Sequence, residues 1–245
     1  MTTTSSRADW LVPTSLVLLT FVPAAAGALR LTQLAGGGEV TADNARYFAT
    51  PLPVVLHIIS VTLFCLLGAF QFAPGFRRRH RAWHRVSGRV LVPAGLTAAL
   101  TGLWMQAFYP PPAGDGLLIA VIRYAVGTAM IASIVLGFRA ILRRDVKTHS
   151  AWMIRGYAIG LGAGTQVFTH LPWAIAGVTP SGTTRALLMA AGWVINILVA
   201  EWIIRRKPAR SRRAVPAGQP VHPAAAAHRV PSAGTTSSSR PAPPG

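Results

Sequence analysis

The stretch LPVVLHIISVTLFCLLGAFQFAP (residues 52–74) decides the fold class, because it is long, apolar and free of charged side chains. An α-helix rises 1.5 Å per residue, so about 20 such residues cross the roughly 30 Å hydrocarbon layer of a bilayer. Further apolar stretches of similar length lie on both sides of it. The six predicted spans are Trp10–Leu31, Leu52–Pro74, Val86–Tyr109, Leu117–Leu142, Trp152–Val178 and Ala186–Ile204. The sequence therefore predicts an all-α integral membrane bundle of six transmembrane helices.

The basic residues are distributed unevenly over the connections, and this pattern predicts the orientation. The chain carries a formal net charge of +18 and has a pI near 11.9. Lys and Arg gather in the second and fourth connections and after the sixth span, whereas the other connections contain few. Connections rich in Lys and Arg stay in the cytoplasm, so both termini are predicted to be cytoplasmic (N-in, C-in). We expect the basic face to contact the headgroups of anionic lipids, and nothing in the pattern favours a nucleic-acid partner.

One membrane domain is predicted between two polar ends. Residues 1–9 form a polar leader, residues 10–204 the six-span domain with its core in spans two to five, and residues 205–245 a basic Pro/Ala/Ser-rich tail. Such a tail has too little apolar surface to offset the entropy lost on ordering, so we expect it to be disordered. The first span also resembles a secretory signal peptide. We favour an uncleaved helix, because cleavage would leave five spans and an outside N-terminus.

Glycines recur on one face of the third and fifth predicted spans. They are Gly88, Gly95 and Gly102 at every seventh residue, and Gly156, Gly160 and Gly164 at every fourth. Both spacings return to one helix face, where small residues let another backbone or a flat ligand approach closely. We expect close helix packing there, and a slot for a planar cofactor is the alternative.

Two histidines inside predicted spans indicate an internal site. His57 lies about two turns in from the outer end of the second span, and His170 lies toward the outer end of the fifth. Because these helices run in opposite directions, both imidazoles are expected at a similar depth, facing the bundle interior. Gln71 and Gln166 share the faces of these histidines. Arg123, about two turns into the fourth span, either snorkels to the outer interface or pairs with an acidic group of a ligand.

Two facing histidines with a nearby arginine are compatible with haem binding. His57 and His170 are the predicted axial ligands of the haem iron, Arg123 the partner of a propionate, and Gln71 and Gln166 hydrogen-bond donors beside them. The sequence contains no C-x-x-C-H, so such a haem would be held noncovalently as b-type.

His84 and His149 at the cytoplasmic boundary are further cofactor-binding candidates. An inner haem between them is one hypothesis, and contacts with lipid phosphates or loop carbonyls are the alternative. Against an inner haem, His149 and His170 are 21 residues apart, which is about 31 Å along a straight helix, and we do not favour two haems.

Four short runs resemble a bacterial family of predicted membrane proteins. They are PLPVVLH (51–57), GAFQF (68–72), WHRVSGR (83–89) and HSAWMIRGYA (149–158). Over roughly residues 50–175 the chain resembles the family named domain of unknown function 2306. The resemblance implies a multi-span protein of the bacterial cytoplasmic membrane with histidines at these positions, and it implies no particular activity. A looser likeness is to cytochrome b561-type bundles, in which four helices hold haem between histidines.

Three functions therefore stand as hypotheses. The first is haem binding for transmembrane electron transfer. The second is a transporter or proton relay, in which the histidines carry protons and Arg123 binds a small anionic solute. The third is a non-catalytic structural membrane protein, in which the glycine faces serve packing alone. The sequence shows no Ser-His-Asp arrangement and no paired carboxylates for hydrolysis.

Overall fold

A computed structural model of the chain describes residues 7–206, without the side chains of residues 7–9, 74, 76 and 78. Within this range every regular element is an α-helix, so the predicted all-α class is confirmed. Residues 1–6 of the predicted leader and residues 207–245 of the predicted tail lie outside the described residues. Residues 7–9 belong to the first helix, and Arg205 and Arg206 to the last.

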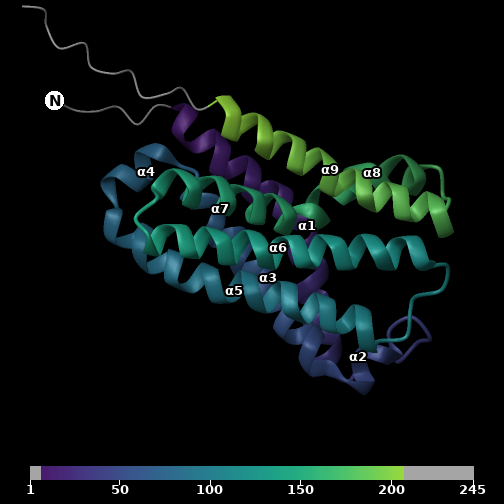
Figure 1. The fold of residues 1–245 in the computed structure, drawn as a ribbon. Helices are drawn as coiled ribbons and strands as arrows, with labels where there is room; N and C mark the ends of the chain where they lie inside the picture. Colours follow the sequence, from purple (N-terminus) through teal and green to yellow (C-terminus); the bar gives the residue numbers. More distant parts are fainter. Residues whose placement is uncertain (1–6, 207–245) are drawn as a thin grey trace, which may run out of the picture. The chain divides into compact units, whose positions relative to one another are not determined.

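Nine helices make up the regular structure of the described range. They are α1 (Arg7–Ala35), α2 (Ala45–Ala49), α3 (Pro51–Gln71), α4 (Pro74–Arg79), α5 (Arg81–Phe108), α6 (Leu117–Leu142), α7 (Val146–Gly160), α8 (Gly162–Ile175) and α9 (Gly182–Arg206). Five of them are long and apolar enough to cross a membrane, namely α1 over Trp10–Ala35 together with α3, α5, α6 and α9. The short helices α2 and α4 lie in connections at opposite ends of the bundle (Figure 1).

The fifth predicted span is interrupted in the structure. α7 ends at Gly160 and α8 begins at Gly162, with Leu161 between them. α7 has 15 residues and α8 has 14, so neither is long enough by itself to cross a membrane. The expectation of one uninterrupted helix over Trp152–Val178 is therefore wrong. Glycine is among the poorest helix formers, and the clustered glycines weaken the helix at this point.

Side chains from other helices satisfy the backbone groups that the break leaves free. The amide Nδ2 of Asn196 in α9 donates to the carbonyl of Ala158 at 3.0 Å. The thiol of Cys65 in α3 donates to the carbonyl of Gly160, with 3.4 Å between Sγ and O. Thr165 donates to Oδ1 of Asn196 at 2.7 Å, which orients the amide. In a bilayer an unpaired backbone group is costly, so these contacts stabilise the interrupted helix.

α7 is the central helix of the described range. It packs against α3, α6, α8 and α9, and residues 156–159 are buried. Around it, α1 packs on α3 and α8, α5 lies between α3 and α6, and α9 packs on α6 and α8. Figure 1 shows that α1 begins and α9 ends at the end of the bundle that carries α4, which we call the α4 end.

The opposite end, which we call the α2 end, gathers three connections. Figure 1 places α2, the α5–α6 connection and the α8–α9 connection there. The backbone N–H of Gly182 donates to the carbonyl of Gly114 at 2.8 Å, so the last two connections are in direct contact. α7 and α8 together therefore run from the α4 end to the α2 end.

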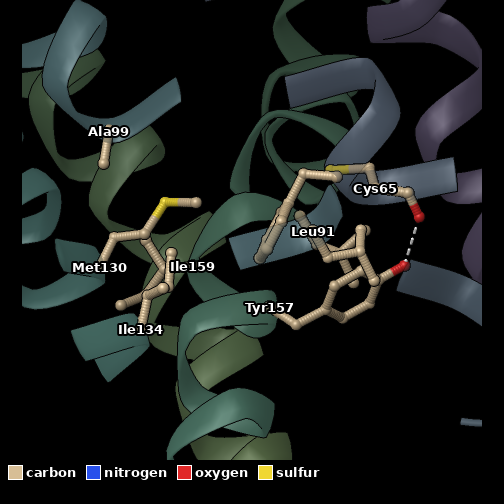
Figure 2. Close-up of a cluster of buried hydrophobic side chains, with 9 residues drawn as sticks. Cys65, Leu91, Ala99, Met130, Ile134, Tyr157 and Ile159 are labelled. Carbon is tan, nitrogen blue, oxygen red and sulfur yellow. Dashed lines mark hydrogen bonds between the residues drawn. The ribbon is translucent and has the colours of Figure 1, made fainter. Parts of the chain in front are cut away.

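A buried apolar cluster joins four of the helices, and we call it the Phe64 cluster. Its members are Phe64, Cys65, Leu91, Ala99, Met130, Ile134, Tyr157, Ile159 and Leu161. Figure 2 shows Met130, Ile134 and Ile159 side by side. It also shows the hydroxyl of Tyr157 donating to the carbonyl of Cys65, at 2.7 Å. This hydrogen bond ties α7 to α3 within the apolar core.

Close helix packing is seen at Gly95 and Gly160, whereas Gly88 has open space beside it. A Cβ atom on Gly95 would lie 2.7 Å from the Phe64 ring, and one on Gly160 would lie 2.9 Å from it. On Gly68 it would strike the ring of Tyr157. The protein's own aromatic rings thus occupy the space beside these glycines, where a planar cofactor was the alternative.

Replacing Gly95 by alanine should destabilise the bundle, because Phe64 and Ile134 are 1% and 0% exposed and cannot move aside. We expect a loss of about 1–3 kcal/mol, the usual cost of overpacking a core. The measurement is the melting temperature of the purified protein in detergent. Gly88→Ala is the matched control on the same helix, since its Cβ would meet nothing within 4 Å. A Gly95→Ala protein that melts at or above the wild-type temperature would contradict this account.

Candidate functional site

A cavity of about 400 Å³ opens at the α2 end of the bundle. Its walls come from α2, α3, α5, α6, α9 and the interrupted α7–α8 segment, together with the prolines of the α5–α6 connection. Its charged, amide, phenol and imidazole side chains are Arg46, Tyr47, His57, Gln106, Tyr109, Arg123, Gln166 and Arg185. This size is within the range of ordinary small-molecule pockets.

The floor of the cavity is the Phe64 cluster. Ala99, Met130 and Ile159 belong to the cluster and also line the cavity. Figure 2 shows these three side chains on the same side of the cluster. Val61 and Gly160 complete this apolar surface. The cavity is therefore polar at its mouth and apolar where it ends inside the bundle.

Two arginines at the mouth share one carboxylate. Nη1 of Arg123 lies 2.7 Å from Oδ2 of Asp115, and Nη1 of Arg185 lies 2.8 Å from Oδ1 of the same residue. Gln106 accepts a further hydrogen bond from Arg123 at 3.2 Å. The Asp115 side chain is 3% exposed, whereas those of Arg123 and Arg185 are 24% and 30% exposed. The carboxylate thus lies behind the guanidinium groups, which remain accessible.

The mouth carries an excess of positive charge. Arg46 is the third arginine of the lining, and its guanidinium lies over the ring of Tyr47 at 4.8 Å. Among the described residues that line the cavity there is no Asp or Glu. A guanidinium offers five N–H donors, and the contacts above use only some of them. The mouth can therefore accept an anion.

Tyr109 closes one side of the mouth. Its hydroxyl donates to the carbonyl of Thr50, at the junction of α2 and α3. Partial burial raises the pKa of Tyr109 above its ordinary value, in keeping with a protonated phenol that donates this hydrogen bond. Its ring packs edge-on against Tyr47, with 5.6 Å between the centroids. The aromatic pair holds α2 against the end of α5.

His57 lies deeper in the cavity, and its orientation is fixed by one ring nitrogen. Nδ1 is 2.8 Å from the carbonyl of Ala98 and 3.3 Å from the hydroxyl of Thr101, both in α5. The hydrogen bonds of the ring within the part of the chain that the structure describes both go through Nδ1, and none goes through Nε2. Gln166 also lines the cavity, and its amide donates to the carbonyl of Met189 at 3.0 Å.

His170 is not among the residues that line this cavity. Its Nδ1 lies 2.9 Å from the carbonyl of Gln166, one turn earlier in α8, and 3.2 Å from the hydroxyl of Thr169. α8 packs on α1, α7 and α9, whereas α3, which carries His57, packs on α1, α5 and α7. The structure therefore brings His57, Gln166 and Arg123 to one cavity and leaves His170 outside it.

The remaining predicted site residues lie toward the α4 end. Gln71 donates to the hydroxyl of Ser87 at 2.6 Å, and its Oε1 is buried without a partner in the described range. His149 bonds through Nδ1 to the carbonyl of Gly137 at 2.8 Å. Nδ1 of His84 is buried without a described partner, and the carbonyl of His84 accepts from the hydroxyl of Ser87. Gln71 is thus a neighbour of the His84 region and does not line the cavity that contains His57.

No group of three or more His, Cys, Asp or Glu side chains within residues 7–206 is arranged to hold a metal ion. The cavity supplies one histidine, so it does not fit the predicted haem held by two axial histidines in the same space.

The sequence interpretation missed Asp115, Arg185, Arg46 and Gln106 as site residues. One available signal is that charged residues are scarce in the connections at the α2 end. Arg123 reaches from α6 to Asp115 in the preceding connection, which is the direction that the snorkelling interpretation predicts. The same side chain lines the cavity, so its pairing with an acidic group of a ligand stays a prediction.

Replacing Asp115 by asparagine should destabilise the α2 end, because both arginines would lose their shared counter-ion. We expect a loss of roughly 1.5–3 kcal/mol, the range for hydrogen bonds to charged groups. Asp43→Asn is the matched control, since Asp43 is exposed and makes no ion pair within the described residues. Equal melting temperatures for the two variants would contradict the bridging role of Asp115.

Most of the chain matches one protein family. Residues 54–204 match the family model described as "Predicted membrane protein (DUF2306)". No curated protein and no solved structure matches the chain. The matched range includes all the helices that line the cavity except α2 and the first turn of α3. The chain therefore belongs to the DUF2306 family of predicted membrane proteins.

Proposed function

We propose that the protein is a membrane transporter that binds a small organic anion in the cavity at the α2 end. The observation that carries this proposal is a cavity with three arginines at its mouth and an apolar interior. A fully hydrated anion would make no use of the apolar interior of the cavity. A neutral lipid would make no use of the arginines at its mouth. The ligand that fits both parts has an acidic group and an apolar body.

The distribution of charge supports an outward-facing cavity. Lys and Arg gather at the α4 end, and such residues mark the cytoplasmic side of a membrane protein. The basic residues at the α4 end are Arg77, Arg79, Arg81, Arg85, Arg139, Arg143, Arg144, Lys147, Arg155, Arg205 and Arg206. With this orientation α1 begins and α9 ends on the cytoplasmic side. The interrupted α7–α8 segment then makes the sixth crossing, and the α4 end lies against anionic headgroups of a bacterial cytoplasmic membrane.

The interrupted helix favours transport over simple binding. Discontinuous helices that line a site within the membrane are characteristic of secondary transporters. Here Gly160 and Ala163, on either side of Leu161, both line the cavity. The Phe64 cluster closes the inner side, as expected for a state open only to the outside.

Benzoate is a suitable probe, because it combines a carboxylate with an apolar ring. We expect benzoate to stabilise the purified protein in nanodiscs, and the neutral isostere benzamide to have little effect. Arg185→Gln should weaken benzoate binding by roughly tenfold or more, since a charge-assisted hydrogen bond is lost while Asp115 keeps Arg123. Proteoliposomes should take up labelled benzoate.

Arg30→Gln is the matched control. Arg30 lies over the same Tyr47 ring at 5.0 Å and does not line the cavity, so its loss should leave benzoate affinity unchanged. Equal stabilisation by benzamide and benzoate, or equal effects of the two arginine variants, would refute the anion site. Binding of benzoate without uptake would refute the transport function, but the anion-binding site would still be supported.

Haem binding is the alternative function, and His57 gives it one favourable feature. A ring nitrogen bonded to a carbonyl leaves the other available to a metal. The residues that line the cavity include no second histidine that could serve as the other axial ligand. We therefore favour anion binding over haem binding. We expect protein expressed with ample haem to show no Soret band that depends on His57. A Soret band that disappears in both His57→Ala and His170→Ala would reverse this order.

A further inference from the structure

The tautomer of His57 follows from its hydrogen bonds. A carbonyl oxygen only accepts, so Nδ1 must carry the hydrogen that it donates to Ala98. The hydroxyl of Thr101 donates to the carbonyl of Thr97, so its oxygen can also accept from the N–H at Nδ1 of His57. In a neutral imidazole one nitrogen donates and the other accepts. Nε2 of His57 is thus an acceptor that makes no hydrogen bond to a described residue, on a side chain that lines the cavity.

The position of His57 relative to the arginines sets the direction of a bound ligand. Gly102 lies beside the imidazole, since a Cβ on Gly102 would be 3.4 Å from Cε1 of His57. Gln106, which contacts Arg123, is four residues further along α5. Four residues are slightly more than one helical turn and rise about 6 Å. A carboxylate is repelled by the acceptor at His57 and attracted by the arginines, so it lies at the mouth.

We propose that His57 is a specificity-determining residue that selects organic acids with a hydrogen-bond donor at the end remote from the acid group. This inference rests on the proposed anion site. The chemical class is a hydroxylated aromatic or short-chain carboxylic acid, with its hydroxyl about one helical turn from its carboxylate. A ligand without the donor leaves Nε2 unpaired in a largely apolar space, which costs affinity.

Three para-substituted benzoates test the inference on the full-length protein in nanodiscs at pH 8. 4-Hydroxybenzoate presents a donor, benzoate presents none, and 4-methoxybenzoate presents only an acceptor. We expect 4-hydroxybenzoate to bind roughly tenfold more tightly than benzoate, by one additional hydrogen bond. The methoxy compound should bind no better than benzoate. Titration calorimetry gives the three dissociation constants.

A pair of histidine variants separates recognition from stability. In His57→Phe the preference for 4-hydroxybenzoate over benzoate should fall to within about twofold, while benzoate itself still binds through the arginines. In the wild-type structure the Thr101 hydroxyl lies 2.6 Å from the carbonyl of Thr97 and 3.2 Å from that of Ala98, so we expect it to share its hydrogen between the two in this variant. His170→Phe is the matched control outside the cavity lining and should keep the wild-type ratio. A loss of stability alone changes all three constants together and not their ratio.

The outcomes distinguish this inference from the proposed function. If benzoate binds and 4-hydroxybenzoate binds no better, the anion site stands and the role of His57 is overturned. The role of His57 is also overturned if 4-methoxybenzoate and 4-hydroxybenzoate bind equally tightly. This comparison uses only the wild-type protein, so it does not depend on whether a variant folds. Retention of the full preference in His57→Phe also overturns it. If none of the three acids binds, the proposed function fails and this inference fails with it.

Discussion

The fit of Phe64 between two glycine faces is the constraint on which the rest of the described structure depends. Its ring lies against Gly95 of α5 and Gly160 of α7 and is 1% exposed. A side chain at either glycine would displace the ring, so these positions set the spacing of α3, α5 and α7. The same cluster ends the cavity, because Met130 and Ile159 belong to both. The packing that stabilises the bundle therefore also closes the inner end of the cavity.

The mouth depends on a different interaction, a single buried carboxylate shared by two guanidinium groups. Asp115 neutralises only one of the two charges on Arg123 and Arg185, and Arg46 adds another. The residual positive potential attracts anions. The shared acid also orders both arginine side chains before a ligand arrives, which lowers the entropy cost of binding. An apolar wall beneath them selects against ions that keep their full hydration shell.

The long helices could be predicted from the sequence, because length and apolar composition are local properties of a membrane-crossing segment. The break at Leu161 could not be predicted, because the clustered glycines only weaken the helix locally, and Asn196, which satisfies a freed carbonyl, is distant in sequence. His57 lines the cavity, whereas its predicted pairing with His170 assumed that α3 and α8 are neighbours, and these two helices both pack on α1 and α7. Asp115 was missed since its role appears only when two connections meet at the α2 end.

The most direct test of the central claim is the accessibility of the cavity from each side of the membrane. Ala163 lines the cavity just after the break in the helix, and Ala163→Cys adds one thiol there. The wild-type chain is the control, because its one cysteine, Cys65, is 3% exposed. With a membrane-impermeant maleimide, we predict labelling of Ala163→Cys from the non-cytoplasmic side, slowed by benzoate. Labelling only from the cytoplasmic side, or none from either side, would contradict an outward-open anion site.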